Sequence, residues 1–595
     1  MKKNFLSYLY FIISVVVATF LWENISISKI SYNPFNDVLR FIIFLFIPFS
    51  TMILFYQTKE KKFFLNFKKI IFFNNYSKIE NFKNFKLNIY FFWILIFLFI
   101  EFLSLNFLDL SYKIDFFHEG MWLSASQNTK FSGNFWTSSY IVRGFFGDFY
   151  PFFVWKISNI ESIGITRFFS ILFVFFNKIL LLLIAKKLCT ISNLRKDFQI
   201  IYFLFLSIVF ISYQGYGAPI FTPRSFLLLL FIYVFLNFLS NYRLNNFYVP
   251  IIGFFSSVSF FWYIDIGLYI NFFIFILLLF FLIKLEFRNF LSLFFSIILG
   301  WLIFYSLISN HEFLEFVNNT FLILTTLNYI HGLVFPTPFI SMDFRTIKSL
   351  LLFLFSGLMI IKSVNYNEEK KYFIFLASVI FLFFISCIYF NYGLSRSDGP
   401  HIRIATGYIF ITFFVLGSFY FLKQLESKYT KESKNLKYIN YTLILFVLTA
   451  VFIDKKYEDK KVVNLKNSFQ TINQLIYFQD SQYISKEYKS LIIRYGDLTK
   501  DDKCVTIFTN EVAMYYFLKK PSCSKYYYMW TAKPQLIQRK IVEDINEKKP
   551  TYILYKSDSD LFYNSDKNLI FVNQYIKNNF SFFEKFLNWE IYKIN

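Results

Sequence analysis

The chain has 595 residues, of which 56% are hydrophobic and 17% are charged, and its mean hydropathy is +0.46. Soluble globular proteins use roughly 45–50% apolar and about 25% charged residues, so this composition excludes an ordinary soluble protein. Only 17 glycines and 12 prolines occur, which excludes a fibrous or disordered chain. The net charge of +23 does not indicate nucleic acid as a partner, because most lysines flank apolar segments and fit the topology of a membrane protein.

The apolar residues are gathered in long runs. A helix needs about 20 such residues to cross a bilayer, and thirteen segments are candidates: 5–22, 38–56, 89–107, 168–186, 198–214, 224–240, 248–264, 266–283, 289–309, 348–361, 372–392, 404–422 and 439–453. The first segment follows Lys2 and Lys3 directly and has no small-residue cleavage site, so we expect a retained anchor and not a signal peptide. The sequence predicts a polytopic α-helical membrane protein with about 13 transmembrane helices.

Basic residues near the ends of the segments predict the orientation. Segment 57–88 carries eight lysines and segment 423–438 carries five, and both fall on one side if thirteen helices alternate. We therefore expect a multi-pass protein of a bacterial inner membrane with its N-terminus in the cytoplasm. The opposite, periplasmic side would hold 108–166, 310–347, 393–403 and the residues after about 454.

The last part of the chain, 454–595, has no run long enough to span a membrane. Its pattern predicts a strand at 505–509, a helix at 510–518, a helix at 534–547 and a strand at 552–555. We expect a transmembrane domain over 1–453 and a small periplasmic α/β domain over 454–595.

Two of the four cysteines lie in this tail. Cys504 and Cys523 flank a predicted strand and helix, and a helix packed back on its strand would bring them within the ~6 Å between Cα atoms that a disulfide requires. Such a bond persists outside the cytosol. The alternative is a pair of unrelated thiols.

The first large outer loop contains an acidic motif. If the stretch is helical, Asp115, His118, Glu119 and Trp122 lie at i, i+3, i+4 and i+7, on one face. Two carboxylates and an imidazole on one face suit proton abstraction or the binding of a divalent cation such as Mg or Mn. The alternative is that Asp115 caps the helix while the other two face water.

A second cluster, Arg396, His401 and Arg403, lies on the outer side, where basic residues are sparse. The planar guanidinium matches the oxygens of a phosphate, although contact with ordinary lipid headgroups explains it equally. In the first outer loop, Arg143 lies with Asp148 among aromatic residues. We interpret Arg143 either as a substrate-binding residue or as half of a surface ion pair.

Two ionisable residues fall inside or beside apolar segments. Asp265 lies at the junction of 248–264 and 266–283 on the outer side, and we expect it to belong to the site. Lys178 lies near the middle of 168–186. A charge there costs on the order of 3 kcal/mol, so its side chain should face the bundle interior, pair, or reach the interface.

Several common motifs are missing from the sequence. It has no glycine-rich phosphate loop followed by Lys and Ser or Thr, no Gly-x-Gly-x-x-Gly after a strand, and no Cys–His cluster with zinc spacing. The use of ATP or a dinucleotide in the cytoplasm is therefore unsupported.

This layout resembles the GT-C superfamily of membrane glycosyltransferases, which includes protein O-mannosyltransferases, aminoarabinose transferases and oligosaccharyltransferase catalytic subunits. The resemblance covers the layout from about residue 89 onward and rests on the acidic motif at Asp115, His118 and Glu119 in the first large outer loop. The motif departs from the usual Asp-x-Asp or Asp-Glu pair, and two spans precede the loop where one is usual. The resemblance implies inverting transfer of a sugar from a polyprenyl-phosphate-linked donor to a glycan, lipid or protein acceptor.

Such a transfer needs a base for the acceptor hydroxyl and cations for the departing phosphate. Asp115 or Glu119 would be the base, with His118 orienting it or binding a metal. The phosphate would be bound by Arg396, His401 and Arg403, and the sugar hydroxyls by Asp265.

Two other functions for a protein of this class are a transporter or flippase and an O-antigen polymerase or ligase. Secondary transporters tend to have repeated halves and helices broken near the midplane, and neither is evident in this sequence. A polymerase or ligase normally carries its large loop between late spans, whereas the chemically rich loop here is early.

Overall fold

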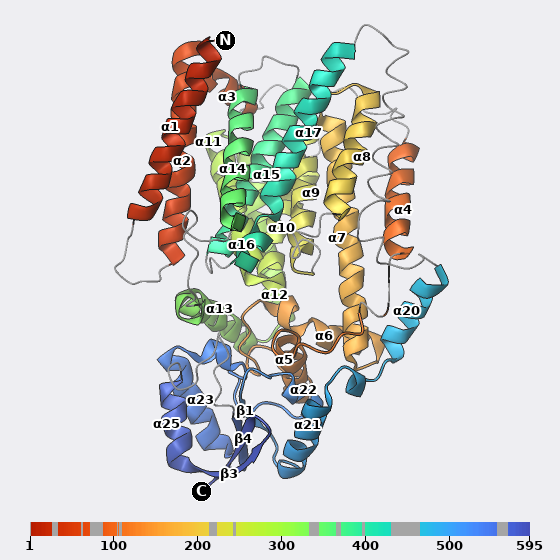
Figure 1. Ribbon diagram of the computed structural model, residues 1–595, viewed down its shortest axis with the longest axis vertical. Coiled ribbons are helices and arrows are strands. Elements are labelled where there is room, and N and C mark those ends of the chain that lie inside the picture. Colours follow the sequence, from red (N-terminus) through yellow and green to blue (C-terminus); the bar gives the residue numbers. More distant parts are fainter. Residues whose placement is uncertain are drawn as a thin grey trace.

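The computed structural model describes residues 2–25, 34–60, 63–71, 87–103, 105, 107, 110–212, 223–241, 245–331, 344–364, 370–394, 399–429, 465–555 and 569–595. Figure 1 shows a long helical bundle with a smaller mixed domain at one end. Among the described residues, eight helices are long and apolar enough to cross a membrane, and three shorter helices are also apolar. The chain is therefore a polytopic helical membrane protein.

The bundle consists mainly of helices at the predicted spans. They are α1 (Lys2–Asn24), α2 (Pro34–Glu60), α3 (Phe63–Ile71), α4 (Leu87–Leu103), α7 (Ile163–Ile191), α8 (Lys196–Ser212), α9 (Phe226–Ser240), α10 (Asn245–Trp262), α11 (Ile264–Ile283), α12 (Phe287–Leu307), α14 (Phe344–Val364), α15 (Lys370–Leu394), α16 (Gly399–Ala405) and α17 (Gly407–Tyr429). The predicted span at 439–453 lies outside the described residues, and the total of thirteen spans stays a prediction.

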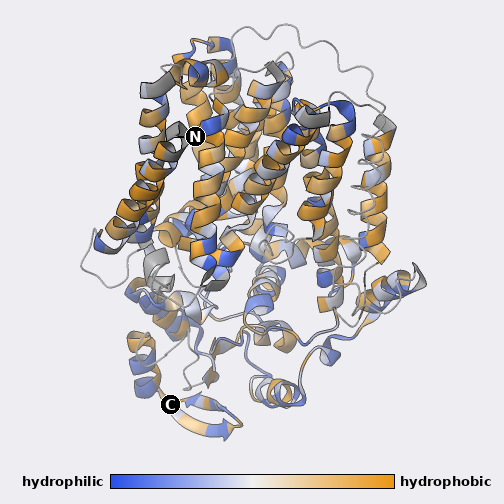
Figure 2. Cartoon of the chain, turned by 45° about the horizontal axis from the view of Figure 1, so that its top comes forward, coloured by the Kyte–Doolittle hydropathy of each residue, from blue (hydrophilic) through white to orange (hydrophobic). Residues whose placement is uncertain are grey.

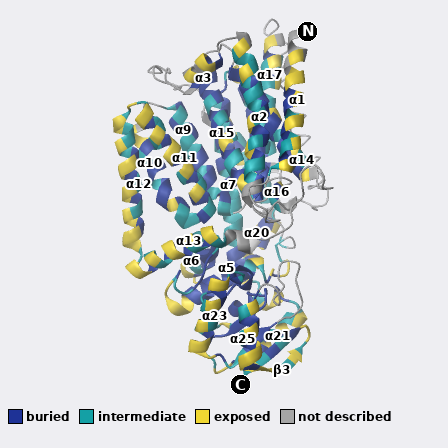
Figure 3. Ribbon diagram, turned by 90° about the vertical axis from the view of Figure 1, so that its left-hand side faces the viewer, coloured by how far each residue is buried: buried dark blue, intermediate teal, exposed yellow. Residues whose placement is uncertain are grey.

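The surface of the bundle is apolar, as Figure 2 shows by its hydropathy and Figure 3 by the exposed residues along α1 and α12. Phe20 is 68% exposed and Phe295 is 61% exposed. Contact of such apolar side chains with water is unfavourable, whereas the hydrocarbon of a bilayer would cover them. Lys178 of α7 is buried and pairs with Glu101 of α4. The carboxylate of Glu101 thus balances the charge of Lys178, which the sequence places in the middle of a span.

Three further helices lie where the bundle meets the smaller domain. The outer loop 108–166 forms α5 (His118–Ser132) and α6 (Phe145–Ser158), and α13 (Asn310–His331) lies across the end of the bundle. The sequence analysis treated 310–347 only as a loop, because α13 mixes apolar with polar residues and does not resemble a span. Its Glu312 accepts hydrogen bonds from the backbone N–H groups of Phe135, Trp136 and Thr137, so α13 supports the chain between α5 and α6.

The tail is a mixed α/β unit. Its elements are α20 (Leu465–Tyr477), α21 (Lys486–Leu498), β1 (Thr506–Phe508), α22 (Met514–Leu518), α23 (Gln535–Lys548), β2 (Tyr552–Tyr555), α25 (Ile570–Asn579), β3 (Phe580–Phe586) and β4 (Trp589–Ile594). The strands are ordered β1-β2-β4-β3, with β1 parallel to β2 and the other pairs antiparallel. A helix is predicted over 510–518, but in the structure regular helix covers only α22, so the helix is shorter than predicted.

The tail and the outer loop 108–166 share one hydrophobic core, which joins residues such as Met121 and Trp155 to Tyr495 and Tyr516. The backbone N–H of Ala513 donates to the carbonyl of Phe116 at 3.1 Å. At this contact a Cβ on Gly120 would lie 2.5 Å from the Ala513 nitrogen, so only glycine permits the approach. The two sides of the predicted boundary at 453/454 therefore pack against each other in the folded protein.

In the structure Cys504 and Cys523 form a disulfide, while Cys189 and Cys387 are free thiols. The segments that carry the two bonded residues lie side by side: the N–H of Cys523 donates to the carbonyl of Val505, next to Cys504, at 3.0 Å.

Maleimide labelling of denatured but unreduced protein isolated from cells should modify Cys189 and Cys387 and leave Cys504 and Cys523 unmodified. After reduction all four cysteines should react, which serves as the control for access. By the chain-entropy model the bond stabilises the tail by about 3 kcal/mol. Labelling of Cys504 and Cys523 without reductant would contradict both the bond and the oxidising compartment that it requires.

Candidate functional site

Arg167, near the start of α7, holds the acidic motif of the outer loop. Its Nε and Nη2 donate to the two carboxylate oxygens of Glu119 at 2.9 and 2.8 Å. The Arg167 and Glu119 side chains are only 7% and 12% exposed. Its Nη1 donates to the carbonyls of Leu110 and Tyr112, at 2.8 Å each. In a site with so little exposure to water, two parallel hydrogen bonds fix the orientation of the Glu119 carboxylate and also balance its charge.

Aromatic rings complete the surroundings of Arg167. Its guanidinium lies 3.7 Å from the ring centroid of Tyr112 and 4.6 Å from that of Tyr483. Tyr483 belongs to the tail, between α20 and α21, and the Ile114 N–H donates to its carbonyl at 2.9 Å. One arginine thus contacts the outer loop, α5 and the tail together.

Asp115 and His118 form a separate and exposed pair. The Oδ1 of Asp115 accepts from the backbone N–H groups of Phe117 and His118, at 2.9 Å each, and its Oδ2 lies 2.7 Å from the Nδ1 of His118. The side chains of Asp115 and His118 are 47% and 60% exposed. Partial burial raises the pKa of Asp115, but the hydrogen bonds and charge of His118 outweigh it and hold the pKa below its usual value. Asp115 is therefore an ionised carboxylate in reach of solvent.

The four residues of the predicted helical face have different roles. Helix α5 begins at His118, so Asp115 precedes it and accepts the backbone N–H of its first residue. Glu119 is turned to Arg167, and its Oε2 also accepts the backbone N–H of Asp115 at 2.9 Å. The indole of Trp122 donates to the carbonyl of His118. The acidic motif thus divides into an accessible acid, Asp115, and an acid that fixes the loop, Glu119.

Arg143 lies next to this motif, with its guanidinium 5.9 Å from the ring centroid of Trp122. Asp148 is not its partner in a surface ion pair: the side chain is buried, and its Oδ2 accepts the backbone N–H of Arg143 at 3.0 Å. Burial raises the pKa of Asp148 to about 6, against the opposing effects of the Arg143 charge and of backbone N–H groups. Asp148 therefore shapes the turn that carries Arg143.

The turn at Arg143 docks on the junction between α10 and α11. The N–H of Ile264 donates to the carbonyl of Arg143 at 2.9 Å. Gly144 has a φ of 138°, and a Cβ there would lie 2.6 Å from the Cα of Tyr263, so both its conformation and its surroundings require glycine. This contact places Arg143 beside the residue that precedes Asp265.

Asp265 pairs with Arg224, a residue of the short 3-10 turn Pro223–Ser225 before α9. The guanidinium of Arg224 lies 4.2 Å from the ring centroid of Tyr392, and that ring lies 5.6 Å from the imidazole of His401. The Nε of Arg224 is buried and has no hydrogen-bond partner among the described residues. The structure thus joins Asp265 directly to Arg224, and Arg224 to His401 only through the ring of Tyr392.

These contacts form one continuous line from the outer loop to the end of the bundle that faces it. It runs from the Asp115–His118 pair through Trp122 and Arg143 to the start of α11, and from there through Arg224 and Tyr392 to His401 in α16. Figure 1 places α16 at the end of the bundle that faces α5 and α6. Arg403, also in α16, is exposed, and Arg396 lies outside the described residues.

The predicted use of Asp115 and Glu119 as ligands of Mg or Mn does not fit this geometry, because both oxygens of Glu119 bind Arg167. Across the described ranges, no group of three or more His, Cys, Asp or Glu residues is arranged to hold a metal ion.

Arg167 and Arg224 were not expected from the sequence. Each lies within a few residues of the start of an apolar segment, where a basic residue usually marks only the membrane interface. Their bonds to Glu119 and Asp265, 48 and 41 positions away, have no local sequence signal.

No family model, curated protein or solved structure matches this chain. The site must therefore be interpreted from its own geometry.

Arg167→Met should destabilise the protein by about 3–5 kcal/mol, because it leaves the Glu119 carboxylate buried without a partner. The double variant Arg167→Met/Glu119→Gln should recover much of that loss. The matched control is Lys519→Met, since Lys519 forms a half-exposed ion pair with Glu161 and should cost no more than ~1 kcal/mol. Thermal unfolding in detergent measures all three. If Arg167→Met costs no more than the control, the ion pair does not fix the loop.

Proposed function

We propose that this protein is an inverting glycosyltransferase, which moves a sugar from a polyprenyl-phosphate-linked donor to an acceptor hydroxyl. The observation that carries the proposal is the line of contacts that joins an accessible, ionised acid at Asp115 to the partly buried Arg224 and, through Tyr392, to His401. These two kinds of group are what such a transfer requires, and they lie where the helical bundle ends, at the level of lipid headgroups.

In the proposed reaction the acceptor oxygen attacks the anomeric carbon of the donor from the face opposite the phosphate. The bond from this carbon to the phosphate oxygen breaks, the acceptor proton passes to Asp115, and polyprenyl phosphate leaves. His118, hydrogen-bonded to Asp115, orients the carboxylate. A positioned base of this kind contributes typically 10²–10⁴-fold to the rate.

The departing phosphate gains negative charge, and preorganised cations stabilise it. Arg224 and the partly exposed His401 supply the inner part of this surface, Arg143 approaches it from the outer loop, and Arg403 of α16 adds an exposed arginine. Arg396, which lies outside the described residues, stays a candidate by its position in the sequence. Asp265 holds Arg224 in place and offers its remaining acceptor capacity to sugar hydroxyls. Glu119, bound to Arg167, positions the loop and is not the base.

The proposed location is a bacterial inner membrane with the N-terminus in the cytoplasm and the tail in the periplasm. The Cys504–Cys523 disulfide supports a tail in an oxidising compartment. The sugar would then be transferred to a glycan, lipid or protein on that side.

Asp115→Asn keeps the shape of the side chain and removes its basicity, so kcat should fall 10²–10⁴-fold. The measurement is transfer of radiolabelled sugar from undecaprenyl-phosphate-linked donors by the protein in proteoliposomes. Glu543→Gln, which alters an exposed acid in the tail, should leave kcat unchanged. Full activity of Asp115→Asn with a donor that the wild type uses would exclude Asp115 as the base.

Arg224→Lys and Arg403→Gln should each weaken the binding of undecaprenyl phosphate, by about tenfold for a charge-assisted bond worth at least 1.4 kcal/mol. Lysine at 224 keeps the charge beside Asp265, so the fold is preserved while the planar donor set is lost. Arg539→Gln, at an exposed arginine of α23, is the control. Wild-type affinity in both site variants would assign these residues to ordinary headgroup contacts.

A further inference from the structure

A cavity of about 250 Å³ lies inside the helical bundle, away from the candidate site. Its walls come from α9, α11 and α15, and Ile70 of α3 closes one side. Eleven of the twelve lining side chains are apolar, and five of these are phenylalanines, at positions 235, 238, 273, 280 and 381. The cavity is therefore suited to a hydrocarbon and not to a sugar or a nucleotide.

The cavity lies toward the end of the bundle that is opposite to the tail. Helix α11 begins at Ile264, beside the candidate site, and ends at Ile283, and the cavity is lined by the last turns of this helix and by Lys284 directly after it. Ile276 on its rim is 40% exposed, on a helix whose outer residues face lipid. Since Ile276 both lines the cavity and is exposed on the outside of the bundle, the cavity reaches the surface that the hydrocarbon of a membrane would cover.

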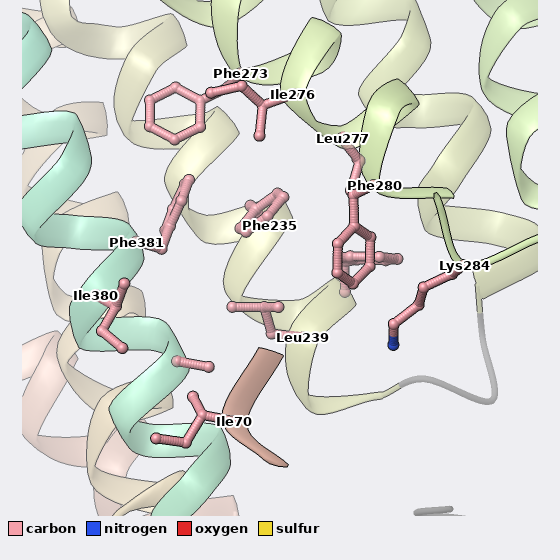
Figure 4. A pocket seen from close by; sticks show the side chains of 12 residues that line it. Ile70, Phe235, Leu239, Phe273, Ile276, Leu277, Phe280, Lys284, Ile380 and Phe381 are labelled. Carbon is pink, nitrogen blue, oxygen red and sulfur yellow. The ribbon is translucent and has the colours of Figure 1, made fainter. Parts of the chain in front are cut away.

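Lys284 is the one charged residue among the lining side chains. Figure 4 shows it beside Phe280 at the edge of the cavity, and its ammonium lies 4.7 Å from the centroid of that ring. Partial burial lowers the pKa of Lys284, with Glu286 opposing. Because α11 ends here, this ammonium lies at the level where lipid phosphates are found.

We propose that this cavity binds one anionic phospholipid of the membrane, with part of an acyl chain among the phenylalanines and its phosphate at Lys284. The occupant follows from the combination of an apolar interior, an exposed lining residue on the lipid-facing side and one cation among the lining side chains. Attraction of an anionic lipid to one lysine near the surface contributes enough for about a fivefold preference over a zwitterionic lipid.

The test uses the full-length protein in nanodiscs that contain trace phosphatidylglycerol or phosphatidylcholine, each with a diazirine in the acyl chain. After illumination, peptides are mapped by mass spectrometry. Phosphatidylglycerol should label the lining residues of α9, α11 and α15 about five times more than phosphatidylcholine. Lys284→Gln should abolish this preference, whereas Arg288→Gln, which removes an exposed arginine just beyond the cavity, should retain it.

A second pair of variants tests the cavity itself. Ala377→Phe fills it from α15 and should remove the labelling of the lining residues, while Leu279→Phe enlarges an exposed, lipid-facing residue of α11 and should not. Equal labelling by both lipids, or labelling unaffected by Ala377→Phe, would overturn the proposal. Absence of labelling in the wild type would also overturn it, and would indicate that another part of this chain fills the cavity.

Discussion

The buried ion pair between Arg167 and Glu119 is the interaction on which the outer part of the molecule depends. Arg167 lies near the start of α7, at the end next to the outer loop. It donates four hydrogen bonds, two to a carboxylate of α5 and two to carbonyls of the loop, while the face of its guanidinium contacts a tyrosine of the tail. A charge in so dry a place is stable only when it is paired. The pair therefore fixes the loop, α5 and the tail to the bundle, and through the N–H of Asp115 it also sets the start of α5.

The proposed chemistry depends on a second contact, at which the turn of Arg143 docks on the junction of α10 and α11. Gly144 makes this approach possible, as Gly120 does where α5 meets the tail. The two glycines let backbone segments approach closely enough to bring an exposed acid and a partly buried arginine into one line of contacts. The acid lies on a loop and the arginine at the end of a membrane helix, so neither element alone forms a site.

Much of the membrane architecture could be predicted because hydropathy is a local property. The helices of the bundle begin and end within a few residues of most predicted spans, and β2 coincides with its predicted strand. Two elements were not expected from the sequence: α13, whose mixed composition suited a loop, and the β3–β4 hairpin. Strand β3 keeps Phe582 and Phe583 largely exposed, so it lacks the clean alternation of apolar and polar residues from which a half-buried strand is recognised.

The sequence by itself determined the class of protein, since hydropathy depends on composition, and it placed Cys504 and Cys523 close enough along the chain for a bond to be expected. The outer-loop site that it indicates stays a prediction. Only the tertiary structure decided what each charged residue does. Asp115 and Glu119 are four residues apart, yet one faces solvent and the other a buried arginine, because the partner of Glu119 lies 48 residues farther along the chain. The role of an ionisable group is set by its neighbours in space and its distance from water, and neither can be seen in a linear sequence.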